Sequence, residues 1–141
     1  DRLADSDFIS KGLETGKLGI FNATKCYHEV NKFENKNIRT LFASTGVKWN
    51  ELAPSYYVDN LIYPNSVNTA PLATIEDWLQ DGIKEQTEIM SEEACNEYFE
   101  MIAEKGVKVE NIYEKLLTDG LDSFKVSFKD LLSKLINSLF L

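Results

Sequence analysis

The chain has 141 residues, of which 43% are hydrophobic and 27% charged, so its composition is globular and excludes collagen-like, low-complexity and mucin-like proteins. Its net charge is −8, and residues 76–104 hold ten acidic residues against the single base Lys84, which leaves the remainder close to neutral. A duplex nucleic acid binds a positive surface, so this charge disfavours nucleic acid as a partner. An acidic helical face explains the acidic stretch most simply.

Apolar runs, the first residues and the cysteines indicate where the protein is expected to be located. Apolar runs are only a few residues long, far short of the roughly 18 needed to cross a bilayer. The first residues, DRLADSDF, contain neither a basic nor an apolar signal region, so we expect no membrane span and no export. Cys26 and Cys95 form no CxxC motif, and this spacing disfavours a zinc site. We expect both to be free thiols in the reducing cytoplasm.

Helical and strand patterns alternate in the first part of the chain. Apolar residues at helical spacing predict an amphipathic helix within residues 16–33 and a shorter one within residues 55–63. The run IRTLFAS, residues 38–44, is typical of a strand buried on both faces of a parallel sheet, and residues 66–71 fit a second strand. This order is typical of a βαβ unit with parallel strands.

Only helices are expected after Gly82. We therefore place an approximate boundary between the α/β part and the helical part of the chain near residue 83. The last helix should present an apolar stripe between Phe124 and Leu139, at clear helical spacing. Capping residues and glycines mark the predicted helix ends, with Thr74 and Ser91 as N-terminal caps and Gly82, Gly106 and Gly120 as stops.

Two parallel strands do not make a complete sheet, because parallel sheets have several strands and are covered on both faces. The chain therefore looks like part of a larger fold. If that fold is an eight-stranded α/β barrel of roughly 250 residues, six strands are missing from this sequence.

Candidate chemistry concentrates after the first predicted strand. His28 is the only histidine and has no second ligand at metal-binding spacing. The cluster Ser44-Thr45-Gly46-Val47-Lys48 directly follows a buried strand, where α/β folds build their active sites. Ser44 and nearby backbone N–H groups are able to bind phosphate oxygens, Gly46 would let the backbone approach a ligand, and Lys48 adds a positive charge. A plain turn with a solvated lysine explains the same residues.

The second predicted strand ends in a similar polar pair. Asn68 and Thr69 either contact a ligand or cap the turn before Pro71. Lys48 is a poor candidate for a Schiff-base nucleophile, because such a lysine needs burial or a neighbouring cation, and Lys48 lies in a polar loop without a second base nearby.

Several blocks of this sequence resemble bacterial transaldolases in order and spacing: GKLGIFNATKCYHEV, LFASTGVK and YYVDNLIYPNSVNTAPLATIEDWLQDG. The tail GVKVENIYEKLLTDGLDSFKVSFKDLL resembles the closing pattern of that family, so the resemblance covers about residues 16–134. It implies a transferase of the non-oxidative pentose phosphate pathway without metal or organic cofactor. The implied reaction moves a dihydroxyacetone unit from sedoheptulose 7-phosphate to glyceraldehyde 3-phosphate through a lysine Schiff base.

The resemblance also implies where the chain lies in the fold. It implies a partial (β/α)8 TIM barrel, with residues 1–82 as the C-terminal segment holding the last two strands. Residues 83–141 would be a helical extension packing on the barrel within the same domain. The Schiff-base lysine and the catalytic carboxylates belong to upstream strands, so we expect this chain alone to be inactive and to need the remainder of the barrel.

Two residues match positions that bind the substrate phosphate in the family, Ser44 and Lys48. Trp49 departs from the small polar residue common in the family at that position. Arg2 does not match the family's phosphate-binding arginine, which would lie before residue 1.

Two other functions stay open at this point. One is a non-enzymatic interaction module whose acidic helices after Gly82 bind a partner. The other is an inactive transaldolase fragment, which would share every motif quoted above. An enzyme piece needs Ser44 and Lys48 near a phosphate, whereas an interaction module would tolerate any turn there.

Overall fold

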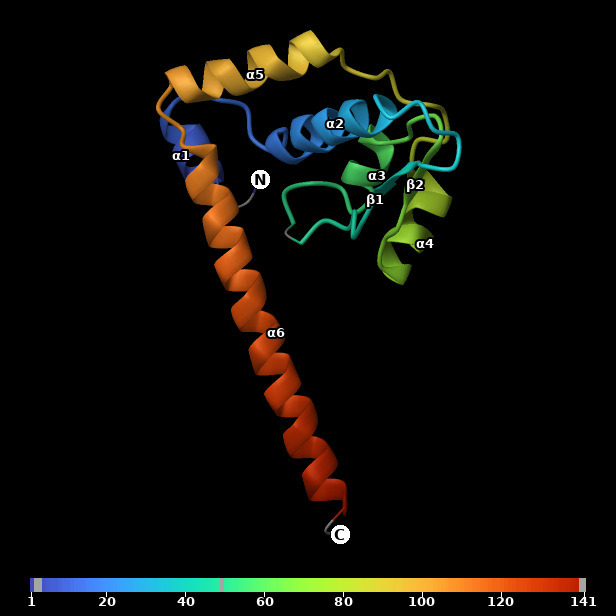
Figure 1. Cartoon of the computed structure of the whole chain (residues 1–141), viewed down its shortest axis with the longest axis vertical. Helices are drawn as coiled ribbons and strands as arrows, with labels where there is room; N and C mark the ends of the chain where they lie inside the picture. The colour runs from blue at the N-terminus through green and yellow to red at the C-terminus, as the bar shows by residue number, and fades with distance from the viewer. Residues whose placement is uncertain (2–3, 49, 140–141) are drawn as a thin grey trace. The chain divides into compact units, whose positions relative to one another are not determined.

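The computed structural model describes residues 1, 4–48 and 50–139. The chain divides into two compact units, Asp1–Lys105 and Gly106–Leu141. The elements of the first unit, in chain order, are α1 (Asp5–Ser10), α2 (Leu18–Asn31), β1 (Thr40–Phe42), α3 (Tyr56–Asn60), β2 (Ser66–Asn68), α4 (Leu72–Asp81) and α5 (Glu92–Glu104), as Figure 1 shows. The second unit contains α6 (Val109–Leu139).

β1 and β2 pair in parallel, with Leu41 opposite Val67, which confirms the predicted parallel pair. Each strand is only three residues long, shorter than predicted. Successive side chains of a strand point to opposite faces of the sheet. Phe42 is buried and lies near Tyr27 of α2, with ring centroids 6.4 Å apart, whereas Leu41 is 55% exposed. The prediction of burial on both faces was therefore wrong: α2 covers one face, and the other face of β1 is open.

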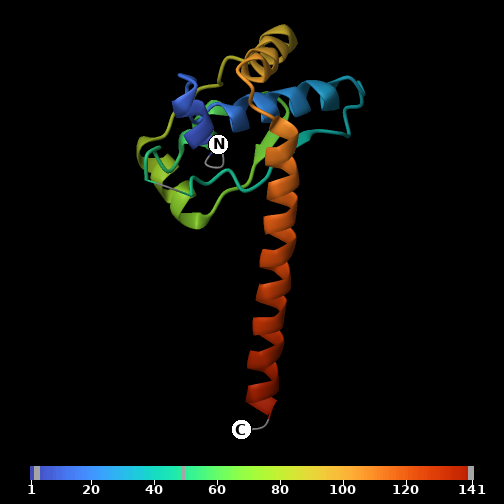
Figure 2. The same cartoon turned by 90° about the vertical axis from the view of Figure 1, so that its left-hand side faces the viewer.

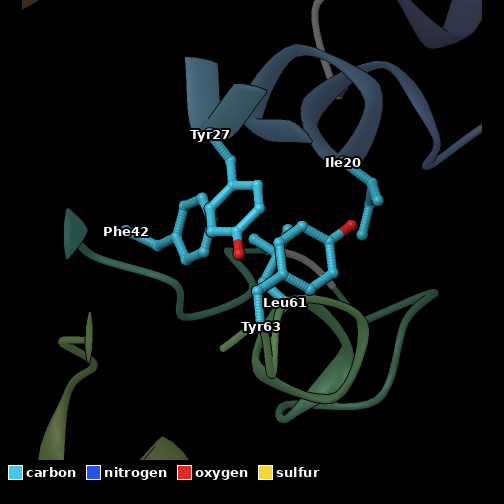
Figure 3. Packing of buried hydrophobic residues seen from close by; sticks show 5 residues of the cluster. All are labelled: Ile20, Tyr27, Phe42, Leu61 and Tyr63. Atoms are coloured by element: carbon cyan, nitrogen blue, oxygen red, sulfur yellow. The ribbon is translucent and has the colours of Figure 1, made fainter. Parts of the chain in front are cut away.

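The core of the first unit is an aromatic cluster between α2 and the strands (Figure 3). Its buried members are Ile20, Tyr27, Phe42, Leu61 and Tyr63. Polar groups within the cluster are paired: Thr24 donates to the carbonyl of Ile20 at 2.9 Å, and the Tyr63 hydroxyl bonds to the Thr24 hydroxyl at 2.8 Å. Burial raises the pKa of Tyr63. These bonds tie α2 to the segment that enters β2.

Replacing Thr24 with valine keeps the shape of the side chain and removes the partner of the Tyr63 hydroxyl. We expect Thr24→Val to lower the free energy of unfolding by about 1–3 kcal/mol, because a buried hydroxyl is left without a hydrogen bond. Urea denaturation followed by circular dichroism, at one fixed chain concentration, measures the change. Thr24→Val combined with Tyr63→Phe removes both polar groups and should recover most of the loss. A double variant as unstable as the single one would contradict this account.

α5 packs on α2 and buries Cys95 and Ile102. The rings of Phe21 and Tyr98 stack with centroids 3.9 Å apart, and Nε2 of His28 donates to the carbonyl of Met90 at 2.8 Å. Lys32 donates hydrogen bonds to Glu29 and Glu92, which raise its pKa to about 12. The glutamates farther along α5 are exposed: Glu97, Glu100 and Glu104. The acidic stretch thus includes a solvated helix face, as its composition indicates.

Of the two predicted N-terminal caps, Ser91 and Thr74, one forms in the structure. Ser91 accepts a hydrogen bond from the N–H of Ala94 at 3.1 Å, so its predicted role as a cap is confirmed. The prediction for Thr74 was wrong, because α4 begins earlier, at Leu72, and Thr74 lies buried inside the helix. Helix α1 was not expected, since its short segment carries little apolar periodicity.

The predicted stop at Gly120 was also wrong. α6 continues from Val109 to Leu139 as one helix, and Figure 2 shows it unbroken. A glycine inside a helix costs only about 1 kcal/mol relative to alanine, and apolar spacing continues on both sides of Gly120. None of the described helices is both long and apolar enough to cross a membrane.

Candidate functional site

The loop after β1 and the end of β2 meet at the carboxyl edge of the sheet. Two groups of Thr69 bond to this loop, and a third bonds to the last residue of β1. Its side-chain oxygen accepts from the N–H of Ser44 at 3.3 Å, and its carbonyl accepts from both the N–H and the hydroxyl of Thr45, at 2.9 and 3.2 Å. The N–H of Thr69 donates to the carbonyl of Phe42 at 3.0 Å. The structure thus brings together two sequence candidates, Ser44 and Thr69.

Ser44 has an unusual backbone. Its φ is 56°, in the left-handed region that residues with a side chain rarely adopt. Its side chain is exposed, while the next residue, Thr45, is buried. Strained backbone of this kind persists where surrounding contacts determine it, often at ligand sites.

Gly46 packs closely against the start of α4. A Cβ added to Gly46 would lie 2.8 Å from the ring of Pro71 and 3.1 Å from the hydroxyl of Thr74. Glycine therefore allows a close approach between this loop and α4. Gly46 also lines the same hollow as Ser44, so its predicted approach to a ligand stays a prediction.

The side chains of Lys48 and Asn68 take no part in the bonds between Thr69 and the loop that are named above. Lys48 is exposed and forms no ion pair within the part of the chain that the structure describes. The Asn68 side chain donates to the carbonyl of Leu61 at 2.9 Å and so serves the turn, while its buried Oδ1 has no partner among the described residues. Arg2 and Trp49 lie outside the described residues.

A hollow of about 370 Å³ runs along β1 from Thr40 to Gly46. Its other walls come from α2, through Gly19, Ala23 and Cys26, and from Tyr57 and Leu61. Ser44 lines this hollow and Lys48 does not. No charged side chain of the described residues lines it, so the hollow alone does not supply the cation that a phosphate site needs.

The carboxylate of Asp1 does not line this hollow but bonds to two residues that do. It accepts a hydrogen bond from the N–H of Gly19 at 2.9 Å, near the start of α2, and another from the hydroxyl of Tyr57. A negative group is favourable at a helix N-terminus, where backbone N–H groups lack partners. A Cβ on Gly19 would lie 2.9 Å from the same carboxylate, so a larger residue there would displace the Asp1 side chain.

A second cavity, of about 460 Å³, lies between α2 and α5. Its lining includes Phe21, Met90 and Tyr98, together with the ion pair of Lys17 and Glu14, whose atoms are 3.7 Å apart. Burial raises the pKa of Tyr98 to about 12. No residue of β1, β2 or the loops after them lines this cavity in the described structure, so it is separate from the candidate site.

β1 and β2 are parallel, and polar loops follow their carboxyl ends. This arrangement is typical of α/β proteins, which place their functional site at that edge of the sheet.

Residues 2–135 match the family described as Transaldolase/Fructose-6-phosphate aldolase. The chain is 45% identical over 126 residues to a transaldolase of Helicobacter pylori (strain ATCC 700392 / 26695), covering 89% of this chain and 39% of the relative. It is 38% identical over 125 residues to a transaldolase of Campylobacter jejuni (strain RM1221), covering 89% of this chain and 38% of that relative.

The chain therefore belongs to the transaldolase/fructose-6-phosphate aldolase family. It spans about two fifths of the length of these curated relatives.

Proposed function

We propose that this chain is the C-terminal part of a transaldolase and supplies the last two strands of its α/β barrel. One observation carries the proposal: the chain belongs to the family and covers only 39% of the length of the H. pylori relative, and its two-stranded sheet is open. Leu41 is exposed on the uncovered face of β1, as expected if it faces the interior of a barrel whose other strands lie outside this chain.

We propose that a neighbouring strand lies in the part of the hollow beside Thr40, Leu41 and Phe42, and that the part beside Ser44 stays open to substrate. β1 pairs only with β2 among the described residues, and an unpaired strand edge offers N–H and C=O groups to another strand. Asp1 is bound to Gly19 and Tyr57, both of which line the hollow. A segment preceding Asp1 in a longer polypeptide would reach the hollow directly.

We further propose that residues 83–141 form the helical extension of this barrel. Six exposed apolar residues of α6 follow a regular alternation of three and four residues: Leu117, Leu121, Phe124, Phe128, Leu131 and Leu135. We call this set the α6 stripe. Such spacing puts the side chains on one face of a helix, and a stripe of this kind is usually buried against another element. In the complete enzyme the stripe would pack on the barrel.

The proposed reaction transfers a dihydroxyacetone unit from sedoheptulose 7-phosphate to glyceraldehyde 3-phosphate, in the pentose phosphate pathway of the cytoplasm. A lysine of the remaining part forms a Schiff base with the donor ketone, and the retro-aldol step leaves an enamine that adds to the acceptor aldehyde. Carboxylates of that part transfer the protons. Our chain contributes Ser44 and Lys48 to the binding of the substrate phosphate.

The family match favours this function over a non-enzymatic interaction module. The acidic residues give no separate support to such a module, because α5 packs on α2 through Cys95 and Ile102 and turns its glutamates to solvent. Solvated acidic faces are common on helices and need no partner.

Tests of the site need a complete enzyme. We define the joined enzyme as the H. pylori transaldolase in which this chain replaces the part that it matches. Lys48→Ala in the joined enzyme should raise the KM for phosphorylated substrates roughly tenfold or more, because a charge-assisted contact to phosphate is lost. Trapping of the Schiff base with borohydride should be unaffected.

A matched control is Lys36→Ala, which removes another exposed lysine shortly before β1 begins, at the other end of the strand. It should leave the KM unchanged. Equal kinetics of Lys48→Ala and the unmodified joined enzyme, with both phosphorylated and unphosphorylated sugars, would remove Lys48 from the proposed site.

A further inference from the structure

We propose that Thr69, at the end of β2, is the positioning residue that holds Ser44 in the conformation needed to bind the substrate phosphate. This inference rests on the proposed function. It assigns to the end of β2 a role in the same site. Thr69 acts through the backbone of Ser44 and Thr45, to which it is hydrogen bonded.

The backbone of Ser44 requires an external support. Its φ of 56° is unfavourable for a residue with a Cβ. Because Ser44 is exposed, packing around its side chain supplies little support. The contacts that fix the turn are those to Thr69: one bond to the N–H of Ser44 and two to Thr45, which is itself buried.

This arrangement leaves the Ser44 hydroxyl available. Among the hydrogen bonds of the described residues, Ser44 takes part through its backbone N–H and not through its hydroxyl. The residue lines the hollow beside β1. A hydroxyl that is held in place and not used by the protein is suited to donate to a phosphate oxygen, and its value depends on how well the backbone is fixed.

The bonds of Thr69 also continue the pairing of the two strands. The last pair in register is Phe42 with Asn68, and Thr69 then donates to the carbonyl of Phe42. The rigid sheet therefore extends by its hydrogen bonds into the loop that carries Ser44. A site residue on a loop gains precision when it is tied to a strand in this way.

Two substitutions at Thr69 separate its side chain from its backbone. Thr69→Val keeps the carbonyl that binds Thr45 but removes the oxygen that accepts from Ser44. Thr69→Ser retains that oxygen. A matched control is Thr40→Val on β1, where the hydroxyl is buried and has no partner among the described residues.

In the joined enzyme we expect Thr69→Val to raise the KM for fructose 6-phosphate about three- to tenfold with kcat within about twofold, since one hydrogen bond to the positioned residue is lost. The KM for unphosphorylated fructose should not change. Thr69→Ser and Thr40→Val should both stay close to the unmodified enzyme. Amide hydrogen exchange of Ser44, measured by NMR in the chain itself, should accelerate in Thr69→Val and not in Thr40→Val.

A double variant tests whether Thr69 acts through Ser44. The increase in KM caused by Thr69→Val should be smaller in a Ser44→Ala background than in the unmodified enzyme. Independent effects, an equal increase for unphosphorylated fructose, or failure of Thr69→Ser to restore the KM would overturn the positioning role while the enzyme remains active. A joined enzyme without transaldolase activity would overturn the proposed function and this inference together.

Discussion

Transaldolase activity is expected to be absent from the chain alone and to appear in the joined enzyme. Under the proposed function the covalent step takes place on a lysine outside this chain, and without that step the barrier to carbon–carbon cleavage is not lowered. Formation of glyceraldehyde 3-phosphate from fructose 6-phosphate and erythrose 4-phosphate, followed with a coupled dehydrogenase, measures both proteins. We expect turnover from the joined enzyme and only the background rate from the chain alone.

The location of the covalent step provides the control for this experiment. Borohydride reduction in the presence of fructose 6-phosphate should attach the sugar to the part contributed by the H. pylori enzyme, as seen by mass spectrometry of the digested protein. No lysine of our chain should carry the label, Lys48 included. Activity of the chain alone, or a label on one of its lysines, would contradict the proposed division of roles. An inactive joined enzyme that folds would favour the inactive-fragment alternative.

Self-association through the α6 stripe is the second large effect that we expect. Every residue of the stripe is more than half exposed, and Phe124 and Phe128 lie near its centre. Burying a phenylalanine side chain is worth about 1.5–3 kcal/mol, so two of them shift an association constant by roughly 100-fold or more. We expect Phe124→Glu combined with Phe128→Glu to convert an associating chain into a monomer in sedimentation velocity.

Val126→Glu is the matched control for this pair. Val126 is an exposed apolar residue of the same helix, and at 100° per residue it points away from the α6 stripe. A charge there should leave association unchanged. In the joined enzyme the paired glutamates should instead lower the melting temperature, because the stripe is then buried on the barrel. A monodisperse monomer that melts cooperatively before substitution would contradict the expected self-association, and an unchanged melting temperature of the joined enzyme would contradict burial of the stripe on the barrel.

The sequence was informative where a few neighbouring residues determine the structure. Helix α2 was predicted from apolar spacing, and Ser91 was predicted as a cap from its position before Glu92 and Glu93. The meeting of Ser44 and Thr69 was also foreseeable in part, because the carboxyl ends of adjacent parallel strands lie at one edge.

Other features depend on distant contacts and left no local signal. Ser44 has a left-handed backbone and is bonded to Thr69, 25 positions away, and serine is not a residue type that indicates this conformation. Thr74 looked like a cap because its pattern is local, but α4 already begins at Leu72, after Pro71, and Thr74 is buried within it. The exposure of Leu41 could not be predicted either, since a buried strand pattern presumes a complete sheet.

The open edge of β1 also constrains how a longer polypeptide assembles. Any strand that adds to this edge has to align with Thr40, Leu41 and Phe42, and a shift of one residue would exchange the two faces of the incoming strand. Side chains meant for the Leu41 side would then point toward α2, into the hollow beside Phe42 and Ala23. We therefore expect the size and polarity of this hollow to favour one alignment of the incoming strand over a shift of one residue.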